Sequence, residues 1–492
     1  MNAASDQPRN SSAAVVGGGL AGLAAAAALC RRGLRVELFE GRKRLGGRAG
    51  SFHDRQTGRP VDFCQHVSMG CCTNLADFCR RIQAADCFRR DRKLHFFSPE
   101  GNRSDVKSCA WLPAPLHLAP GLMRLRYLTL SERWGIVRTM QRLARERLRD
   151  NETVGTWLRQ QGATQRTIER FWSPVLVGAL SETVDRASLA AAQKVFVDGF
   201  LASRRAYELE VPQVPLDEVF NRRAAAWLRR HDVTVHLSWR VLRIDGDASR
   251  ATGIVLGDGT RREFDFVVVA VPWHRVRGLF PDAMLAALPE LAGVENMRPA
   301  PITAVHLWLD RPIMRLPHAV LVGKTSQWVF GPGKEATRGL SQFSWNENGT
   351  VPLCTPASPE AGHYYQVVIS ASHALAGRDR KDILAEVQED LRSIWPDTHD
   401  ARLLHWRVVR QPAAVFSARP DVDRLRPAQR TQIENLALAG DWTATGWPAT
   451  MEGAVRSGHL AAEAVLTRLG SNDPVLVPDL PRGGVVRIFS PH

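Results

Sequence analysis

A glycine-rich turn near the N-terminus constrains this 492-residue chain more than any other feature. The turn, Gly17-Gly18-Gly19-Leu20-Ala21-Gly22, fits the pattern G-x-G-x-x-G. The apolar residues 14–16 before it are typical of a buried strand, residues 23–32 after it favour a helix that ends at Gly33, and residues 35–40 form a returning strand. The sequence therefore predicts a compact βαβ unit at the start of an α/β fold.

The glycines of this turn have separate roles in such a unit. Gly17 allows the tight turn, Gly19 lets a diphosphate approach the backbone, and Gly22 lets the helix pack closely on the strand. Leu20 and Ala21 lead into the helix N-terminus, where unpaired N–H groups and a partial positive charge favour a diphosphate. The pattern predicts dinucleotide binding, and a chance glycine turn before an alanine-rich helix is the alternative.

A carboxylate and a second glycine pair follow the βαβ unit. Glu40 ends the returning strand 23 residues after Gly17, where a carboxylate accepts hydrogen bonds from a ribose diol. The next residues include Arg42 and the segment Gly46-Gly47-Arg48. The diglycine can bring backbone near the diphosphate, and Arg48 can neutralise it through a charge-assisted contact. This continuation favours FAD over NAD, and a solvated basic loop is the alternative.

The last third of the chain supplies the rest of the predicted nucleotide site. A buried strand ends at Gly440, Asp441 follows, and a new helix begins at Met451-Glu452. The positive end of that helix would suit the electron-rich N1/O2 edge of a reduced flavin.

At these residues the chain resembles the amine oxidase/phytoene desaturase superfamily of FAD oxidoreductases. The resemblance implies non-covalent FAD, since Cys354 is the last cysteine and no cysteinyl flavin link can form in the C-terminal third. It also implies that Val241 contacts the adenine side through its backbone. The residues that the resemblance assigns to FAD are Gly17, Gly19, Leu20, Ala21, Gly22, Glu40, Arg42, Gly46, Gly47, Arg48, Val241, Gly440, Asp441, Met451 and Glu452.

The same resemblance implies a discontinuous Rossmann-type FAD-binding domain with an inserted α+β substrate domain. We expect residues 13–110, 205–285 and 425–470 to form the first, and residues 111–204 and 286–424 to form the second, membrane-facing one. Residues 1–12 are polar and small, which predicts a disordered lead-in. Residues 471–492 form a Pro- and Gly-rich tail that the pattern does not place.

Segments in the middle of the chain narrow the resemblance. They are similar to the hydroxysqualene dehydroxylases, squalene-associated FAD enzymes, over roughly residues 14 to 465. The segments are Val61–Gly70, Leu112–Leu118, Phe171–Pro174, Ala179–Glu182, Pro301-Ile302 and Gln327–Phe330. The chain departs from that family at Phe63-Cys64, where Asn-Gly is usual, and at Ser181, where Asn is frequent.

Two rival members of the superfamily differ in how well they fit. Amine oxidases tend to carry an aromatic residue before the Met-Glu-Gly turn and a lysine near residue 304, whereas this chain has Thr450 and Ala304-Val305. A phytoene-desaturase-like enzyme is the closer alternative. A flavin-bearing or flavin-free isoprenoid-binding protein without turnover is a further one.

The resemblance implies reductive dehydroxylation of hydroxysqualene to squalene. The leaving hydroxyl needs a proton donor, and the resulting allylic cation needs a hydride, which N5 of reduced FAD supplies in a desolvated pocket. His66 is the first candidate for the acid because it follows the Arg44–Arg48 segment, and Asp62 and Glu182 are further candidates. A structural imidazole and capping or ion-paired carboxylates are the alternatives. The side chains proposed to line an apolar tunnel or to steady a cation are Trp172, Trp308 and Trp328, each otherwise a core residue.

Charge and composition bear on partners and location. Lys and Arg number 65 against 50 Asp and Glu, a net charge of +15 that favours anionic partners. An apolar segment, residues 111–130, precedes a basic helix over residues 131–149, which predicts contact with an anionic membrane face; ordinary core packing is the alternative. Residues 13–30 are uncharged but rich in glycine and alanine, so we expect a strand and a helix there instead of a membrane span.

The remaining expectations concern metals, nucleic acid and compartment. Cys64, His66, Cys71 and Cys72 crowd together without a second ligand pair at zinc-finger spacing, so we expect no metal. The arginines follow no RNA-module or helix-turn-helix pattern, so we expect no nucleic acid. The eight cysteines form no CxxC pair, which favours reduced thiols in the cytoplasm. Together with the predicted membrane contact, this leads us to expect the protein at the inner face of the cytoplasmic membrane. The sequence does not indicate the external electron donor.

Overall fold

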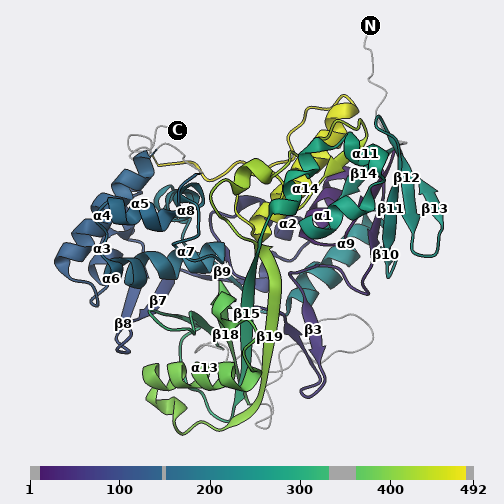
Figure 1. Ribbon diagram of the computed structural model, residues 1–492. Coiled ribbons are helices and arrows are strands. Elements are labelled where there is room, and N and C mark those ends of the chain that lie inside the picture. Colours follow the sequence, from purple (N-terminus) through teal and green to yellow (C-terminus); the bar gives the residue numbers. More distant parts are fainter. Residues whose placement is uncertain (1–10, 147–150, 332–361, 484–492) are drawn as a thin grey trace.

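The computed structural model describes residues 11–146, 151–331 and 362–483. One half of the molecule is built on a five-stranded parallel sheet in the order β10-β2-β1-β14-β20. Its strands are β1 (Ser12–Val16), β2 (Arg35–Glu40), β10 (Thr234–Leu237), β14 (Phe266–Val269) and β20 (Leu436–Leu438). The predicted α/β fold is confirmed, and the first and last strand–helix units share this sheet (Figure 1).

Helix α1 (Leu20–Cys30) begins three residues earlier than the sequence predicted. Gly19 is its N-cap, with φ −75° and ψ 178°, so the glycine turn ends at Leu20 and Gly22 lies in the first helical turn. A Cβ on Gly22 would lie 1.9 Å from the carbonyl oxygen of Gly17. Helix and strand therefore meet backbone to backbone, as the motif requires.

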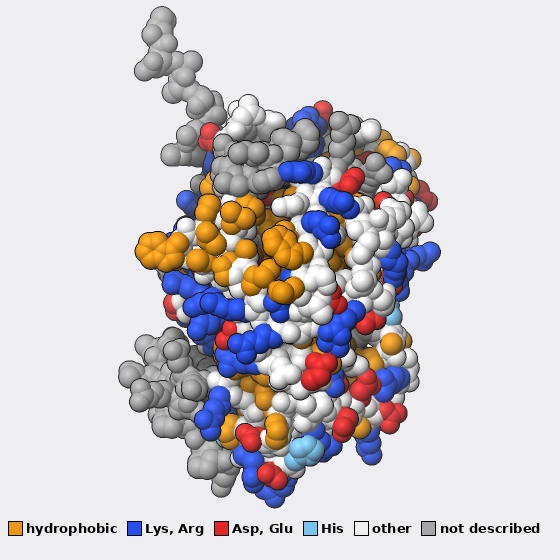
Figure 2. All heavy atoms as spheres, turned by 90° about the vertical axis from the view of Figure 1, so that its left-hand side faces the viewer, with side chains coloured by type: hydrophobic (Ala, Val, Ile, Leu, Met, Phe, Trp, Pro, Cys, Tyr) orange, Lys and Arg blue, Asp and Glu red, His pale blue; other side chains and the backbone are white. Residues whose placement is uncertain are grey.

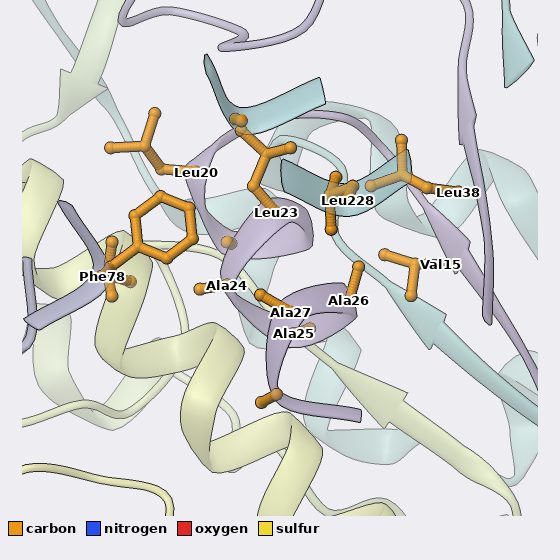
Figure 3. Packing of buried hydrophobic residues seen from close by; sticks show 14 of the residues in the cluster. Val15, Leu20, Leu23, Ala24, Ala25, Ala26, Ala27, Leu38, Phe78 and Leu228 are labelled. Atoms are coloured by element: carbon orange, nitrogen blue, oxygen red, sulfur yellow. The ribbon is translucent and has the colours of Figure 1, made fainter. Parts of the chain in front are cut away.

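The alanines of α1 let other helices approach it closely. Leu20, Leu23 and the run Ala24–Ala28 are buried, with Phe78 of α2 (Thr73–Arg81) and Leu228 of α9 (Ala224–Arg230) packed around them (Figure 3). The long helix α14 (Met451–Arg468) crosses at Gly458, where a Cβ would lie 2.2 Å from the Ala21 carbonyl oxygen.

The other half of the molecule is built on a seven-stranded, mainly antiparallel sheet in the order β19-β15-β18-β17-β16-β7-β8. Its strands are β7 (Lys93–Phe97), β8 (Arg103–Lys107), β15 (Pro299–Leu309), β16 (His318–Leu321), β17 (Trp328–Phe330), β18 (His363–Ser370) and β19 (Leu403–Phe416). Strands β7 and β8 come from the segment expected in the nucleotide-binding domain, yet they pair in this second sheet. The division of the chain into domains stays a prediction.

Helices cover both faces of this sheet (Figure 1). Helix α13 (Arg380–Ile394) packs on the face that carries Val305 and Leu307, and the opposite face, with Ala304, packs toward a helical group. The helices of that group are α3 (Ala119–Met123), α4 (Leu130–Arg145), α5 (Val154–Gln160), α6 (Gln165–Thr167), α7 (Ser173–Leu180) and α8 (Leu189–Phe196).

Pro174 does not break a helix in two, as a proline within one usually does. It lies inside a continuous helical run over residues 165–180, directly after a π-helical turn over Ile168–Trp172. A π-helical turn is one way in which a helix accommodates an irregularity without ending.

Smaller elements complete the fold. A turn over residues 257–260 joins β12 (Ala251–Leu256) to β13 (Arg261–Glu263). The other described strands and α-helices are β3 (Ser51–Asp54), β4 (Arg59–Asp62), β5 (Ser68–Met69), β6 (Phe88–Asp91), β9 (Leu209–Pro212), β11 (Val241–Gly246), β12 (Ala251–Leu256), β13 (Arg261–Glu263), α10 (Trp273–Val276) and α11 (Asp282–Ala286).

The tail that the sequence left unplaced runs from α14 to the helical group (Figure 1). The Asp479 carboxylate pairs with Arg456 of α14 at 2.6 Å and lies 3.5 Å from Lys194 of α8. The backbone N–H of Gly483 donates to the Ala202 carbonyl at 2.9 Å. The tail therefore ties the two halves together as far as residue 483.

None of the helices in the three described ranges is both long and apolar enough to cross a bilayer. The uncharged residues 13–30 form most of β1 and all of α1, as the sequence predicted, and they lie almost wholly buried in the half built on the parallel sheet.

Gly458→Ala should separate α14 from α1, because the added methyl would meet the Ala21 backbone. We expect a loss of about 1–3 kcal/mol of stability. Gly135→Ala in α4 is the matched control: nothing lies within 4 Å of its Cβ position, so it should be neutral or stabilising by up to about 1 kcal/mol. Thermal unfolding of both variants measures the difference, and equal melting temperatures would contradict the packing argument.

Candidate cofactor and substrate site

One cavity of about 1170 Å³ lies between the parallel sheet and the second sheet. That volume is above the roughly 300–1,000 Å³ of ordinary small-molecule pockets. The glycine turn, Glu40 and the start of α14 line one part of it, and α7 with strands of the second sheet lines another. A cofactor site and a second compartment are therefore continuous.

The glycine turn presents bare backbone to this cavity. Gly17 has φ +114°, and a Cβ there would lie 2.5 Å from the Ala270 carbonyl oxygen. No atom lies within 4 Å of the Cβ position of Gly19, so this glycine faces open space at the N-terminus of α1. Gly46 and Gly47 (φ +90° and +59°) approach from the other side, where the Gly46 N–H donates to the Gly18 carbonyl at 2.9 Å. Such a cradle fits a diphosphate.

Glu40 is held rigidly at the end of β2. Its carboxylate accepts the N–H groups of Gly18 and Arg42, each at 2.8 Å, and it lines the cavity with Val241. Each carboxylate oxygen has lone pairs beyond these bonds, so the group can still accept from a ribose diol. Glu40, Arg42 and Val241 therefore line the same cavity, and the sequence predicts that Glu40 and Val241 contact the adenosine part of the cofactor.

Arg48 and Asp441 form a pair in the cavity wall. The Arg48 guanidinium lies 2.6 Å from the buried Asp441 carboxylate and donates to the Ala414 carbonyl at 2.8 Å. Asp441 follows Gly440, whose φ of +145° and contact with the Trp442 indole exclude a side chain. The pair fixes both residues beside the predicted diphosphate and ribityl stretch.

Met451 and Glu452 begin α14, and their side chains differ in role. Met451 lines the cavity and packs on the core of the parallel sheet. The Glu452 carboxylate is fully buried and accepts the N–H of Leu75 at 2.7 Å and of Asn74 at 3.2 Å, and burial raises its pKa. Glu452 therefore ties α14 to the start of α2.

The cavity wall contains every residue predicted for the cofactor except Gly22, which packs against Gly17. Sequence reasoning missed the contribution of β19, residues 412–415, which line the cavity beside Arg48. Pro412 stands inside that strand, and a proline argues against a strand in a sequence pattern.

Comparison with known proteins agrees with this geometry. The sequence profile of the flavin containing amine oxidoreductase family matches residues 20–466. The chain belongs to this family. FAD is its cofactor, and the wall described above supplies the cradle for it.

Relatives of this flavoenzyme cover nearly its whole length. The zeta-carotene desaturase of Synechocystis sp. is 24% identical over 482 residues, covering 92% of this chain and 96% of its own. The hydroxysqualene dehydroxylase of Sinorhizobium fredii is 27% identical, covering 92% and 98%. The structure of wild-type putrescine oxidase bound to putrescine superposes with a TM-score of 0.66 at 15% identity, covering 93% of this chain and 99% of that one.

Of the three candidate acids in the flavoenzyme, only His66 lines the cavity. Its Nδ1–H donates to the Cys64 carbonyl at 2.8 Å, which leaves Nε2 as an acceptor in the neutral ring. Burial lowers the pKa of His66. The charged, proton-donating form is therefore the minor one at neutral pH.

Asp62 and Glu182 lie outside the described cavity wall. Asp62 accepts the Ser51 hydroxyl at 2.6 Å and the Leu216 N–H at 2.9 Å, and burial raises its pKa to about 7. Glu182 is fully buried and bonded to Ser417, with Arg186 at 3.3 Å. Both carboxylates have structural bonding partners, which matches the alternative that the sequence left open for them.

The three tryptophans proposed to line an apolar tunnel differ in whether they line the cavity. Trp172 and Trp308 are buried in the core and do not line the cavity, whereas Trp328 does. In the described part of the chain, no three His, Cys, Asp or Glu side chains converge as metal ligands. Burial raises the pKa of the Cys64 thiol to about 12, which keeps it protonated at neutral pH.

Gly19→Val should fold but lose FAD. The backbone at Gly19 suits any residue, and its Cβ position is open, so the side chain would occupy the space predicted for the diphosphate. We expect a colourless protein with an unchanged melting temperature for the apoprotein, checked by flavin absorbance and thermal unfolding. Full flavin occupancy would contradict the assignment.

Asp62→Asn should make stability less dependent on pH. A raised carboxyl pKa means that the folded protein holds a proton that the unfolded chain releases, so stability falls as pH rises from about 4 to 7. Asparagine keeps an acceptor for Ser51 and Leu216 without the charge. The melting temperature of the variant should exceed that of wild type at pH 8 by about 2 °C or more and match it at pH 4. An equal difference at both pH values would argue against this origin.

Proposed function

We propose that this flavoenzyme reductively removes the hydroxyl group of hydroxysqualene to give squalene. The observation that carries the proposal is the apolar arm, which we define as the part of the cavity between α7 and the second sheet. Its walls include Val175 of α7, Phe96, Phe330, Val368 and Ile302. A long polyisoprene would exchange water for this surface, which is favourable by about 25 cal/mol per Å² of apolar area.

The charges in the cavity disfavour an amine substrate. Three carboxylates line the described wall, and each has partners: Glu40 accepts backbone N–H groups, Asp441 pairs with Arg48, and Glu452 holds α2. All three belong to the nucleotide half. The described arm therefore offers an ammonium group no carboxylate, in line with Thr450 in place of an aromatic cage residue.

The chemistry needs a proton for the leaving hydroxyl and a hydride for the allylic cation. Reduced FAD supplies the hydride when bound. The arm holds the chain and excludes water that would otherwise capture the cation. His66 is the proposed acid, since it is the one candidate of the three in the described wall, and Asp62 and Glu182 are no longer favoured.

The kinship with zeta-carotene desaturases supports a second candidate, desaturation of a long polyisoprene. One experiment separates the two. Anaerobic incubation of the reduced enzyme with hydroxysqualene should give squalene and oxidised flavin. If no squalene forms, and phytoene or zeta-carotene instead reduces the flavin of the oxidised enzyme, the desaturase is favoured. If the protein binds these lipids but converts none of them, it is an isoprenoid-binding protein.

His66 should give the dehydroxylation an acid-dependent rate. Because burial lowers the pKa of His66, its protonated fraction should rise about tenfold for each unit that pH falls between 8 and 7. Single-turnover flavin reoxidation by hydroxysqualene should follow that slope in wild type. In His66→Ala it should be slower and flat, with unchanged flavin content. An unchanged rate in the variant would remove His66 from the mechanism.

We further propose that the enzyme lies on the anionic inner face of the cytoplasmic membrane. Figure 2 shows hydrophobic side chains gathered, with Lys and Arg around them, on the face that lies to the left in Figure 1. The large apolar side chains exposed between positions 111 and 134 are Trp111, Leu116, Met123, Leu130 and Trp134. Leu125, Tyr127 and Leu128 of the same segment are buried instead, so part of the predicted anchor is core.

The proposed membrane contact predicts a charge-dependent affinity. Arg138, Arg142 and Arg145 lie exposed on α4, and each basic residue near an anionic surface contributes about 1 kcal/mol. Changing all three to Glu should weaken binding to vesicles with anionic lipid by at least a hundredfold. The control carries the same charge change elsewhere, Arg229→Glu with Arg380→Glu and Lys381→Glu on α9 and α13, and should bind like wild type. Equal loss in both would indicate net charge alone.

A further inference from the structure

We propose that Ser370 and Gln411, which we call the polar pair, bind the oxygen of an isoprenoid alcohol where the apolar arm meets the cofactor part of the cavity. The inference rests on the proposed function and assigns specificity residues for its substrate. Ser370 ends β18 and Gln411 lies in β19, and both residues line the cavity.

Strand pairing directs both side chains of the polar pair toward the cavity. Ile302 of β15 pairs with Ser370 on one side and with Gln411 on the other. Residues paired directly across two antiparallel strands project from the same face of the sheet, with about 5 Å between their Cβ atoms. Ile302 lines the cavity, whereas Ile369, next to Ser370, packs on the opposite face with α13. The Ser370 and Gln411 side chains therefore flank Ile302 in the cavity wall.

The polar atoms of the pair are unpartnered and open to the cavity. The backbone of Ser370 is fixed by the Gln327 side chain, which accepts its N–H at 2.8 Å and donates to its carbonyl at 3.0 Å. Among the described residues, neither the Ser370 hydroxyl nor the Gln411 amide has a hydrogen-bond partner, and neither is enclosed by protein atoms. Ser370 is only 5% exposed and lines the cavity, so the open space beside its hydroxyl is the cavity itself.

Other hydroxyl groups in the described wall differ from that of Ser370. The Ser68 hydroxyl is enclosed by protein atoms and does not open to the cavity. The Thr450 hydroxyl caps α14: it accepts the Gly453 N–H at 3.1 Å and donates to the Pro448 carbonyl at 3.2 Å. Apart from Ser370, Ser181 alone among the hydroxyl-bearing residues of the described wall is both unpartnered and open.

Ser181 ends α7 and lies near the ends of the two strands that carry the polar pair. The neighbouring Glu182 carboxylate bonds the hydroxyl of Ser417, directly after β19, and lies 3.4 Å from Nε2 of His373, three residues after β18. Ser181 is only 6% exposed. Its hydroxyl therefore offers a third neutral polar group on the helical side of the cavity.

The polar pair lies between the cofactor part of the cavity and its apolar wall. Gln411 directly precedes residues 412–415, which line the cavity beside Arg48, and the Arg48 guanidinium donates to the Ala414 carbonyl at 2.8 Å. On the other side of Ser370, Val368 and Phe330 continue the apolar wall. An oxygen bound by the pair would lie next to the cofactor, with the hydrocarbon chain in the arm. Hydride transfer to the carbon that bears the oxygen needs such a position.

The polar pair favours an alcohol over a hydrocarbon of the same length. Serine hydroxyl and glutamine amide groups both donate and accept hydrogen bonds, so they can bind a neutral alcohol oxygen. A hydrocarbon would cover the same groups and leave them buried without a partner, which costs binding free energy. Neither group titrates at physiological pH, so the pair positions the oxygen and leaves its protonation to the proposed acid, His66.

Two variants and their combination remove the polar groups with little change in shape. Ser370→Ala deletes one oxygen, and Gln411→Met keeps the length of the side chain without its amide. The matched controls are Ser104→Ala in β8 and Gln366→Met in β18. Both control residues are buried, carry a polar atom without a partner and lie outside the described cavity wall.

The test is equilibrium binding of radiolabelled hydroxysqualene and squalene, in detergent micelles, to the oxidised holoenzyme, which cannot supply a hydride. Wild type and both controls should bind the alcohol more tightly than the hydrocarbon. Ser370→Ala and Gln411→Met should each lower that preference about twofold to tenfold, the range expected for one hydrogen bond. The double variant should bring the ratio of the two affinities close to one while it retains squalene binding. Flavin absorbance checks that each variant is the holoenzyme.

The outcomes separate this assignment from the proposed function. Equal affinities for the two lipids in wild type, or an unchanged preference in the double variant, would overturn the role of the polar pair, even where the reduced wild type forms squalene. Loss of both lipids to the same degree in the variants would show a packing effect and overturn it likewise. If Gln411→Met loses its flavin, Ser370→Ala decides alone by the same criterion. Wild type that binds neither lipid would overturn the proposed function and, with it, this assignment.

Discussion

The close approach of α1 to its neighbours is the constraint on which the rest of the structure depends. Gly22 meets the backbone of Gly17 on one side, and Gly458 of α14 meets that of Ala21 on the other. Both contacts are closer than any side chain allows, so α1 lies packed between the parallel sheet and α14 (Figure 3). Because α14 starts at the cavity, this packing also fixes where Met451 lies relative to the glycine turn.

Buried polar groups then align the loops around that rigid centre. Arg426 is buried and donates to the backbone carbonyls of Thr443 at 3.0 Å, Asp441 at 3.2 Å and Trp447 at 2.8 Å. Its charge is balanced by Asp423 at 2.7 Å. One guanidinium thus shapes the loop that carries Asp441 to Arg48. A planar group with five donors can serve several carbonyls at once, which lysine cannot.

The parts of the molecule that the sequence predicted are those that depend on local geometry. The roles of the glycine turn, Glu40 and the start of α14 depend on residues within one turn or one strand. All of these residues line the cavity except Gly18 and Gly22. Asp62 and Glu182, the weaker candidates for the acid, do not line the cavity, because their orientation depends on partners far along the chain, at Leu216 and Ser417. Arg426 carried no signal, since an isolated arginine in a loop is usually a solvated side chain.

The lining of the apolar arm is also a feature that the sequence does not predict. Alternation along β15 and β18 decides which side chains reach it: Ile302 and Val368 face the cavity, while their neighbours Val367 and Ile369 pack toward α13. Both faces of the sheet are apolar, so the sequence predicts buried strands without telling one face from the other. The pairing of Ile302 with Ser370 and of Trp328 with Val368 sets the register, and a slip of one residue would turn Val367 toward the cavity in place of Val368. The shape of the arm therefore follows from strand register, which only the folded chain defines.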